Sequence, residues 1–300
     1  MPAFLDPEHL HAFLLSTIRL GAWLLLLALV FLPLERLFAL RRRKVFGKSL
    51  ASDIGFFFIS GLVPSLLLTP LLALVALGAH AVVPWHLQVA VAALPIWARA
   101  AGALLVGEIG FYWGHRWTHE IPFLWRFHCV HHNPAQVYFL ISARAHPIDN
   151  VFTRLCGLVP VYVLGLATPL TPAGGVVSAL LVLVLTLWGF LIHANLRWRL
   201  GPLEWLISTP AFHHWHHTLD APQDRNFASM LPLIDWIFGS YHLPRNEWPA
   251  AYGIAATLPG SLGRQLLYPL RSPPNIPPEA AAASPARAQE RLGWTTTHGS

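Results

Sequence analysis

Charged residues are scarce in this 300-residue sequence, where Asp, Glu, Lys and Arg together make up 11%. Soluble domains carry roughly 25%. Hydrophobic residues reach 55% and the mean hydropathy is +0.50. Apolar runs at 20–34, 54–77 and 176–192 approach the ~20 residues that cross the hydrocarbon core of a bilayer. The composition therefore excludes a soluble enzyme and predicts an integral membrane protein.

Cysteine is also scarce, with only Cys129 and Cys156. Two cysteines cannot build a disulfide framework, a four-cysteine iron–sulfur cluster or a zinc ribbon. The sequence has no Gly-x-Ser-x-Gly motif, so a nucleophilic hydrolase of that kind is excluded. The net charge of +6 does not indicate nucleic-acid binding, because the basic residues are spread along a hydrophobic chain.

The apolar runs predict an all-α, polytopic fold with four or five membrane helices. We expect three segments at about 12–40, 54–77 and 95–113, followed by a hairpin with arms at 151–170 and 176–193. Acidic residues near the N-terminus do not fit a cleavable signal, so the first segment is expected to stay as an anchor. The predicted divisions are 1–107 for the first helices and connectors, 108–242 for the histidine-rich domain, and 243–300 for a C-terminal extension that is disordered from about 272.

Basic residues predict the orientation. Arg41, Arg42, Arg43, Lys44 and Lys48 cluster after the first segment, whereas the connectors at 78–94 and 169–175 contain no Lys or Arg. Cytoplasmic loops carry such an excess of Lys and Arg. We therefore expect a histidine-rich cap on the cytoplasmic side, in a bacterial inner membrane.

Histidine is abundant, and eleven of its seventeen residues lie between positions 115 and 217. They form the groups His115-Arg-Trp-Thr-His119, His128-Cys-Val-His131-His132 and His213-His-Trp-His216-His217. Residues three and four apart share one face of a helix, so each group can direct several imidazoles to a common point. Pro122, Pro134 and the sequence Ser208-Thr209-Pro210 mark the expected helix boundaries. Isolated histidines such as His80, His86 and His242 are interpreted as structural.

So many imidazoles beside a bilayer predict a metal centre. Protonated rings would repel one another, and neutral rings would leave polar nitrogens without partners. Eight or more ligands exceed the four of a tetrahedral zinc site, so the number of ligands predicts two metal ions. Arg116 follows His115 where a zinc protease needs glutamate. Two redox-active irons at a membrane surface indicate O2 activation and attack on a lipid C–H bond.

The runs from Glu108 to His119 and from Leu124 to His132, with His193-Ala-Asn-Leu and Thr209 to His217, resemble the histidine boxes of the fatty acid hydroxylase and sterol desaturase superfamily. The resemblance implies a membrane di-iron enzyme that uses O2 as co-substrate and two electrons to hydroxylate or desaturate a lipid. It assigns two iron ions to a set of nine ligands: His115, His119, His128, His131, His132, His193, His213, His216 and His217. With no haem, flavin or nicotinamide motif in the sequence, electrons would come from a separate ferredoxin- or cytochrome-type partner.

Within the third group, helical geometry allows either His214 or His216 to join His213 and His217. The spacing of the second group, where position 129 is cysteine, favours His216. His146 is the weakest candidate ligand, with a structural role as the alternative.

Glu108 is the candidate catalytic residue outside the histidines. A carboxylate inside a membrane helix is costly and usually marks function. It lies seven residues before His115, on the same helical face, so we expect it to accept a hydrogen bond from a ligand imidazole. Asp235 and Asn226 are weaker candidates for such a role. Arg116, Arg126 and Arg144 are interpreted as headgroup or partner contacts, and Arg99 as a side chain that reaches back to the interface.

Two other classes stay open. A membrane zinc hydrolase would work without O2, and a metal transporter would place ionisable residues through the membrane interior, where only Arg19, Arg99 and Glu108 are found. The sequence leaves several properties open: the lipid substrate, hydroxylation against desaturation, the electron donor, the oligomeric state, and whether residues 151–193 span fully.

Overall fold

A computed structural model describes residues 7–44, 47, 49–167, 172–219, 222–256 and 258–271 of the chain. Residues 169–171 of the predicted turn at 169–175, and the tail from 272, lie outside these residues. Helices account for the architecture, and within the described ranges the only β-pairs are isolated bridges. The elements are α1 (Pro7–Leu37), α2 (Leu50–Val82), α3 (Trp85–Ala92), α4 (Ile96–Glu120), α5 (Pro122–His132), η2 (Phe139–Ala143), α6 (Pro147–Val163), α7 (Pro172–His193), η3 (Gly201–Trp205), α8 (Pro210–His216), α9 (Pro232–Ile237) and α10 (Leu262–Arg271).

Three helices are long and apolar enough to cross a membrane, namely α1, α2 and α7. The pair α3–α4, bent by 113°, makes a fourth if it counts as one broken span. The predicted all-α membrane fold is confirmed, with three or four candidate membrane helices where four or five were predicted. The first arm of the predicted hairpin is α6, whose 17 residues extend only ~26 Å.

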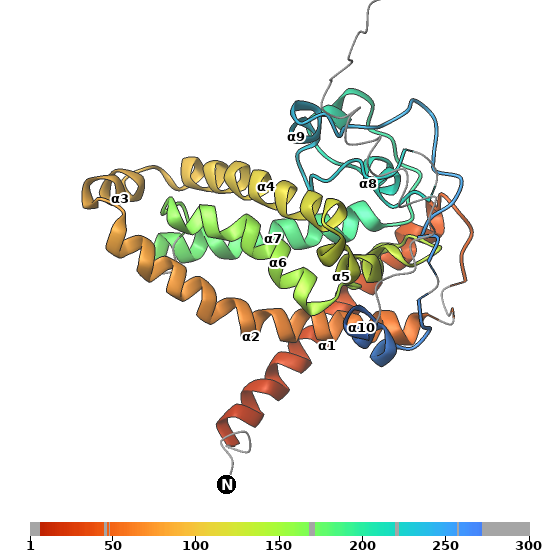
Figure 1. The fold of residues 1–300 in the computed structure, drawn as a ribbon, viewed down its shortest axis with the longest axis horizontal. Coiled ribbons are helices and arrows are strands. Elements are labelled where there is room, and N and C mark those ends of the chain that lie inside the picture. The colour runs from red at the N-terminus through yellow and green to blue at the C-terminus, as the bar shows by residue number, and fades with distance from the viewer. Residues whose placement is uncertain are drawn as a thin grey trace, which may run out of the picture.

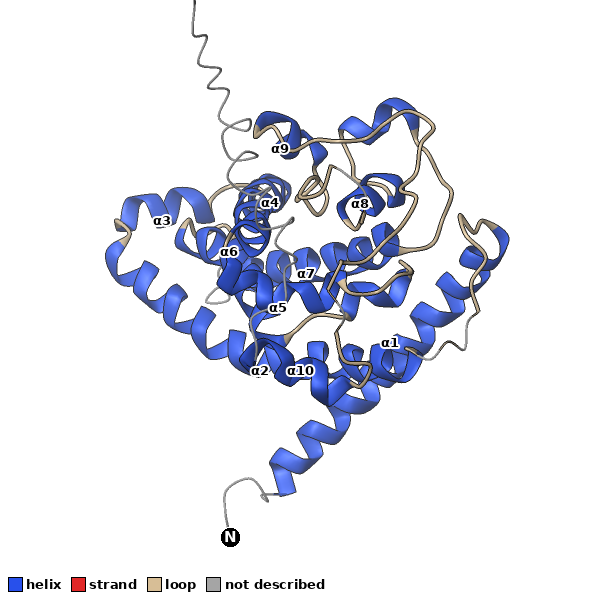
Figure 2. Cartoon of the chain, turned by 45° about the vertical axis from the view of Figure 1, so that its right-hand side comes forward, coloured by secondary structure: helices blue, strands red, loops and turns tan. Residues whose placement is uncertain are grey.

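The helices form a bundle that carries a cap at one end. In Figure 1, α2, α4, α6 and α7 run along one another, and α5, α8, α9 and the long loops gather at the right-hand end. The first half of α1 extends away from this body in both views (Figures 1 and 2). Helix α6 lies in the middle, in contact with both α2 and α4. The cap therefore rests on the ends of α4 and α7, which deliver histidines to it.

Glycines bring α4 and α6 into close contact. A Cβ atom at Gly110 would lie 2.2 Å from the carbonyl oxygen of Cys156, and one at Gly114 would lie 2.6 Å from the Cys156 Cβ. Small residues allow membrane helices to approach to backbone distance. A larger side chain at Gly110 would push α4 away from α6 and displace the end of α4 that carries His115.

Two arginines differ from their predicted surface roles. Arg99 is 3% exposed, and its Nε donates to the carbonyl oxygen of Leu166 at 3.2 Å. It thus binds a carbonyl just beyond the C-terminal end of α6 instead of reaching the interface.

Arg144 is equally buried and forms an ion pair with Asp53 of α2, while its Nη2 donates to Gln265 of α10 at 2.7 Å. The interpretation of Arg144 as a headgroup contact is wrong, because a buried carboxylate and a buried amide occupy its guanidinium.

Candidate metal centre

The structure brings all nine predicted ligands together in two neighbouring groups. The first contains His115, His119, His128, His132 and His216, and the second contains His131, His193, His213 and His217. Within each group, the potential ligand nitrogens lie within 4.8 Å of one another. The groups adjoin, since the rings of His132 and His217 stack with centroids 4.5 Å apart.

Helical spacing explains how the two groups form. Residues four apart stay together: His128 and His132 of α5 enter the first group, and His213 and His217 at α8 enter the second. The histidine three residues after the first one of each helix belongs to the other group. His131, three residues after His128, therefore lies in the second group. His216 correspondingly joins the first group. Neighbouring rings at positions i and i+1 point ~100° apart, which aims them at different centres.

The predicted helix boundaries are confirmed at both histidine helices. Helix α5 begins at Pro122 and ends at His132, two residues before Pro134. Helix α8 begins at Pro210, and its N-cap Thr209 accepts a hydrogen bond from the Phe212 amide at 3.3 Å. Proline at the first helical position lacks only an N–H that would be unpaired there anyway.

The hydrogen bonds fix which ring nitrogen faces each centre. His115 Nδ1 donates to the carbonyl oxygen of Phe227 at 2.7 Å, and His128 Nδ1 donates to the carboxylate of Asp149 at 3.0 Å. A neutral imidazole that carries its proton on Nδ1 presents a bare lone pair at Nε2. The Nε2 atoms of His115 and His128 nevertheless lie 3.2 Å apart. Two lone pairs cannot hydrogen-bond to each other.

The second group repeats this arrangement. His131 Nδ1 donates to the carbonyl of Arg144 at 3.1 Å, and His193 Nδ1 donates to that of Gly189 at 2.6 Å. Their Nε2 atoms lie 3.2 Å apart. In the first group, the Nε2 atoms of His119 and His216 are buried and have no hydrogen-bond partner. Each group thus concentrates unpaired nitrogen lone pairs in a buried space.

A cation is the partner that such an arrangement fits. Two nitrogens ~2.1 Å from one ion, at ligand angles of ~90–110°, are ~3.0–3.4 Å apart. The separation between the Nε2 atoms of His115 and His128, 3.2 Å, falls in this range, as does the 3.2 Å between those of His131 and His193. The residues therefore fit a metal ion in each group, and neutral imidazole suits zinc, iron, copper and nickel.

Burial keeps the cap histidines neutral. It holds the pKa of His131, His132, His213, His216 and His217 well below the ordinary 6.5, and neighbouring imidazoles lower each pKa further. A ligand histidine must be deprotonated to bind a metal. These side chains are therefore ready to bind a metal at neutral pH without first releasing a proton.

One loop orients three rings of the first group. Asp224 accepts from His119 Nδ1 at 3.1 Å, and the carbonyls of Arg225 and Phe227 accept from His216 and His115 at 2.8 and 2.7 Å. The backbone at Asp224 has φ 56°, a left-handed conformation that Asp and Asn tolerate better than most residues. The loop that follows α8 thus returns over the first group and sets its ring orientations.

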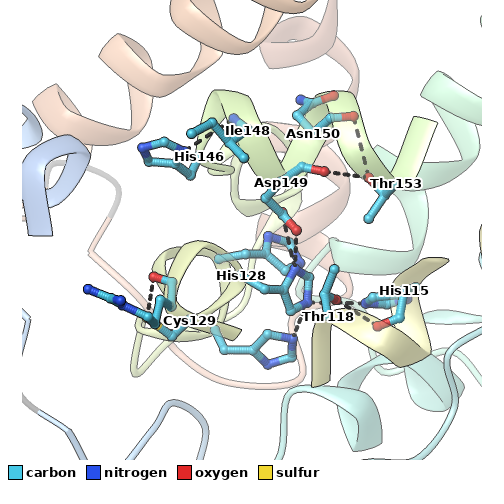
Figure 3. A network of polar contacts seen from close by, with 12 residues as sticks. His115, Thr118, His128, Cys129, His146, Ile148, Asp149, Asn150 and Thr153 are labelled. Atoms are coloured by element: carbon cyan, nitrogen blue, oxygen red, sulfur yellow. Dashed lines mark hydrogen bonds and ion pairs between the residues drawn. The ribbon is translucent and has the colours of Figure 1, made fainter. Parts of the chain in front are cut away.

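The carboxylates that hold ligand imidazoles are Asp149 and Asp224, which sequence reasoning missed. Figure 3 shows Asp149, in the first turn of α6, directed at His128. The only local signal was an acidic residue in the first turn of an apolar helix.

The prediction that Glu108 holds an imidazole is wrong. Its Oε2 accepts from the backbone amides of Met230 and Leu231 at 2.7 and 3.1 Å, and its buried Oε1 has no partner.

Glu108 and Asp235 act on the loop instead of on a ring. Asp235 accepts from the amides of Phe227 and Ala228 at 2.7 and 2.8 Å, and Glu108 accepts from those of Met230 and Leu231. The carbonyl oxygen of Phe227 accepts a hydrogen bond from His115. Both carboxylates therefore position His115 indirectly, through the backbone of this loop. The weaker expectation that Asp235 accepts from a ligand imidazole is therefore wrong as well.

Two further histidines considered in the sequence analysis lie outside both groups. His214 is fully buried, with Nδ1 2.8 Å from the Tyr252 hydroxyl and Nε2 3.1 Å from the Ala194 carbonyl oxygen. His146 is the N-cap of α6: its Nδ1 accepts from the Ile148 amide, and its Nε2 lies 3.1 Å from the carbonyl oxygen of Leu266 (Figure 3). Both contacts give these histidines structural roles.

Comparison with known proteins matches residues 100–240 to the fatty acid hydroxylase family. The ornithine lipid hydroxylase of Rhizobium tropici is 34% identical over 55% of this chain and 48% of its own length. The alkylglycerol monooxygenase of Danio rerio is 34% identical over 46% of this chain and 29% of its own length. A methylsterol monooxygenase of Arabidopsis thaliana is 30% identical over 49% and 55%, respectively.

The resemblance to the fatty acid hydroxylase and sterol desaturase superfamily is confirmed over residues 100–240 of this chain. The matched region, 100–240, contains all nine histidines of the two groups and both carboxylates that orient them. The chain spans about half or less of the curated relatives it matches. No solved structure matches it. None of the three relatives is named as a hydrolase, so the zinc hydrolase alternative gains no support.

Proposed function

We propose that this protein is a membrane-embedded di-iron oxidoreductase that uses O2 and two external electrons to hydroxylate or desaturate a membrane lipid. The observation that carries the proposal is the pair of buried, all-histidine groups whose Nε2 lone pairs converge without other partners. The relatives' names, which refer to ornithine lipid, alkylglycerol and methylsterol, support a lipid as the substrate class.

Two iron ions, when bound, would supply the O2 chemistry. His115, His119, His128, His132 and His216 would hold one, and His131, His193, His213 and His217 the other. The protein itself would orient the imidazole rings and keep bulk water away from them. Backbone carbonyls and the carboxylates of Asp149 and Asp224 fix the rings, and all nine histidines are shielded from bulk water. Such exclusion prevents reactive species from being lost to side reactions.

Electrons are proposed to come from a separate ferredoxin- or cytochrome-type protein. We further propose that the cap faces the cytoplasm of a bacterial cell, because Arg41, Arg42 and Arg43 follow α1 on the side of the cap. Cysteine labelling of intact cells tests this orientation. Labels introduced at Arg42 and Gln223 should both be protected from a membrane-impermeant reagent, and labelling of only one of them would refute the shared side.

The decisive test compares lipid extracts from cells that express the wild-type chain or the His217→Ala variant. Mass spectrometry should show, with the wild type only, a lipid that has gained one oxygen atom or lost two hydrogens. Purified protein should contain about two iron ions per chain. Zinc instead of iron, with turnover that persists without O2, would overturn the proposal in favour of hydrolysis.

A further inference from the structure

The cap exposes large apolar side chains that its own fold leaves uncovered. They come from two short segments in contact, η3 and α9. We call this surface the η3–α9 patch and define it by six residues, each 46–63% exposed: Leu203, Trp205, Leu206, Leu233, Trp236 and Ile237. Scattered exposed leucines are normal on soluble surfaces, but a contiguous patch of this kind marks a binding surface.

The attachment of α9 to α4 fixes the level of the patch along the bundle. The amide of Leu231, directly before α9, donates to Glu108, and Phe238, directly after α9, stacks on Tyr112 with centroids 5.2 Å apart. Helix α9 therefore lies beside the stretch 108–112 of α4. These residues precede the cap end of α4, Glu120, by twelve to eight positions, or ~18 to ~12 Å along the axis.

This level lies within the stretch of α4 that crosses the bilayer if α3 and α4 together form one broken span. Counted from Ile96, a 30 Å hydrocarbon core takes up ~20 residues and ends near position 116. The side chains of α4 agree, because Leu105 and Ile109 are apolar and exposed, whereas the ion pair of Arg116 and Glu120 begins the charged end. The η3–α9 patch thus continues the lipid-facing surface of α4.

Arginines mark the polar border of the same surface. Arg116 donates to the carbonyl oxygen of Phe238 at 3.2 Å, and Arg225 donates to that of Gly239 at 2.9 Å, both at the C-terminal end of α9. The two guanidiniums line a cavity of about 40 Å³. Apolar side chains with tryptophan on one side and arginines on the other match the boundary between acyl chains and phosphate headgroups.

We propose that the η3–α9 patch inserts into one leaflet of the bilayer as a non-spanning membrane contact, with Arg116 and Arg225 at the level of the lipid phosphates. The cap then lies partly within the leaflet. The proposal rests on the position of α9 along α4 and is independent of the metal and of the reaction.

Site-directed spin labelling of the full chain tests the insertion. The Trp236→Cys variant, made in a Cys156→Ser background because Cys129 is fully buried, is labelled and reconstituted into vesicles of phosphatidylcholine and phosphatidylglycerol. Leu105→Cys on the exposed face of α4 provides the lipid reference, and Arg245→Cys in an exposed cap loop provides the water reference. Accessibility to apolar O2 and to a water-soluble nickel chelate is measured for each label.

The label at 236 should resemble the one at 105, with an O2-to-nickel accessibility ratio several-fold above that at 245. A ratio equal to that at 245 would place the patch in water and overturn the proposal. Protection from both reagents would also overturn it, because a protein would then cover the patch. If Trp236→Cys does not fold, as judged by its metal content, Ile237→Cys, at a side chain that is 60% exposed, gives the same test.

Discussion

Replacing Asp149 with asparagine separates the two histidine groups experimentally. The Asp149 side chain is 4% exposed, and both its oxygens lie near His128 Nδ1, at 3.0 and 3.1 Å. Asparagine keeps the size and one acceptor oxygen but removes the negative charge that faces His128 Nδ1. Loss of such a partner typically costs 10- to 100-fold in metal affinity. We expect this loss, about 1.4–2.7 kcal/mol, at the first group only, since no ligand of the second group contacts Asp149 in the described part of the chain.

The assay is a competition between metal-free protein in detergent and a chromophoric zinc chelator, which resolves a tight and a weakened binding event. Asp224→Asn is the matched control. Its carboxylate also holds a ligand of the first group, His119, but is 30% exposed, so water screens it and the expected loss is smaller. Equal weakening of both binding events by Asp149→Asn, or unchanged binding at both, would refute the role assigned to Asp149.

Four further results are expected. His217→Ala should lose metal and all turnover, whereas His214→Ala should keep most of its metal, with a stability loss of about 1–3 kcal/mol from the unpaired Ala194 carbonyl, as measured by metal analysis and thermal melting. Arg144→Leu should lower the free energy of unfolding by about 3–5 kcal/mol, because it leaves Asp53 buried without its partner; an unchanged melting temperature would contradict this. Glu108→Gln should lower the melting temperature but leave the metal content nearly unchanged, since Glu108 holds backbone amides and no ring. Loss of metal without a change in melting temperature would restore the predicted role of Glu108 as an acceptor for a ligand imidazole. Melting of the metal-free protein should shift downward as the pH falls below 6.5. The cap histidines have a lower pKa folded than unfolded, so the unfolded chain binds more protons there, at up to about 1.4 kcal/mol per pH unit for each histidine; a pH-independent melting temperature would contradict it.

The clustering of the nine histidines could be predicted from the sequence because helical spacing is a local property. Residues three and four apart must share a face, so His128, His131 and His132 could be assigned without knowledge of the fold. Proline and threonine at helix starts gave the boundaries of α5 and α8 for the same reason. The choice of His216 over His214 also held in the geometry, since only His216 lies within a group.

The supporting contacts could not be predicted, because they join residues that are distant in sequence. Arg144 and Asp53 are 91 positions apart, and His119 and Asp224 are 105 apart. Glu108 shows the limit most clearly. It lies seven residues before His115 on one helix, yet a loop more than a hundred residues later provides its partners. Burial of a carboxylate was predictable from the sequence, but the identity of its donors depends on tertiary packing.

Neighbouring histidines belong to different groups, and this determines the point in chain synthesis at which each histidine group becomes complete. The last ligand of the first group is His216 and that of the second is His217, so both become complete within one residue of each other. By then α7, which carries His193, has already been made and must be placed in the membrane. No shorter nascent chain offers a finished site of either kind. On the proposed function, a metal ion can therefore occupy a complete group only after the chain has been synthesised as far as His216 or His217.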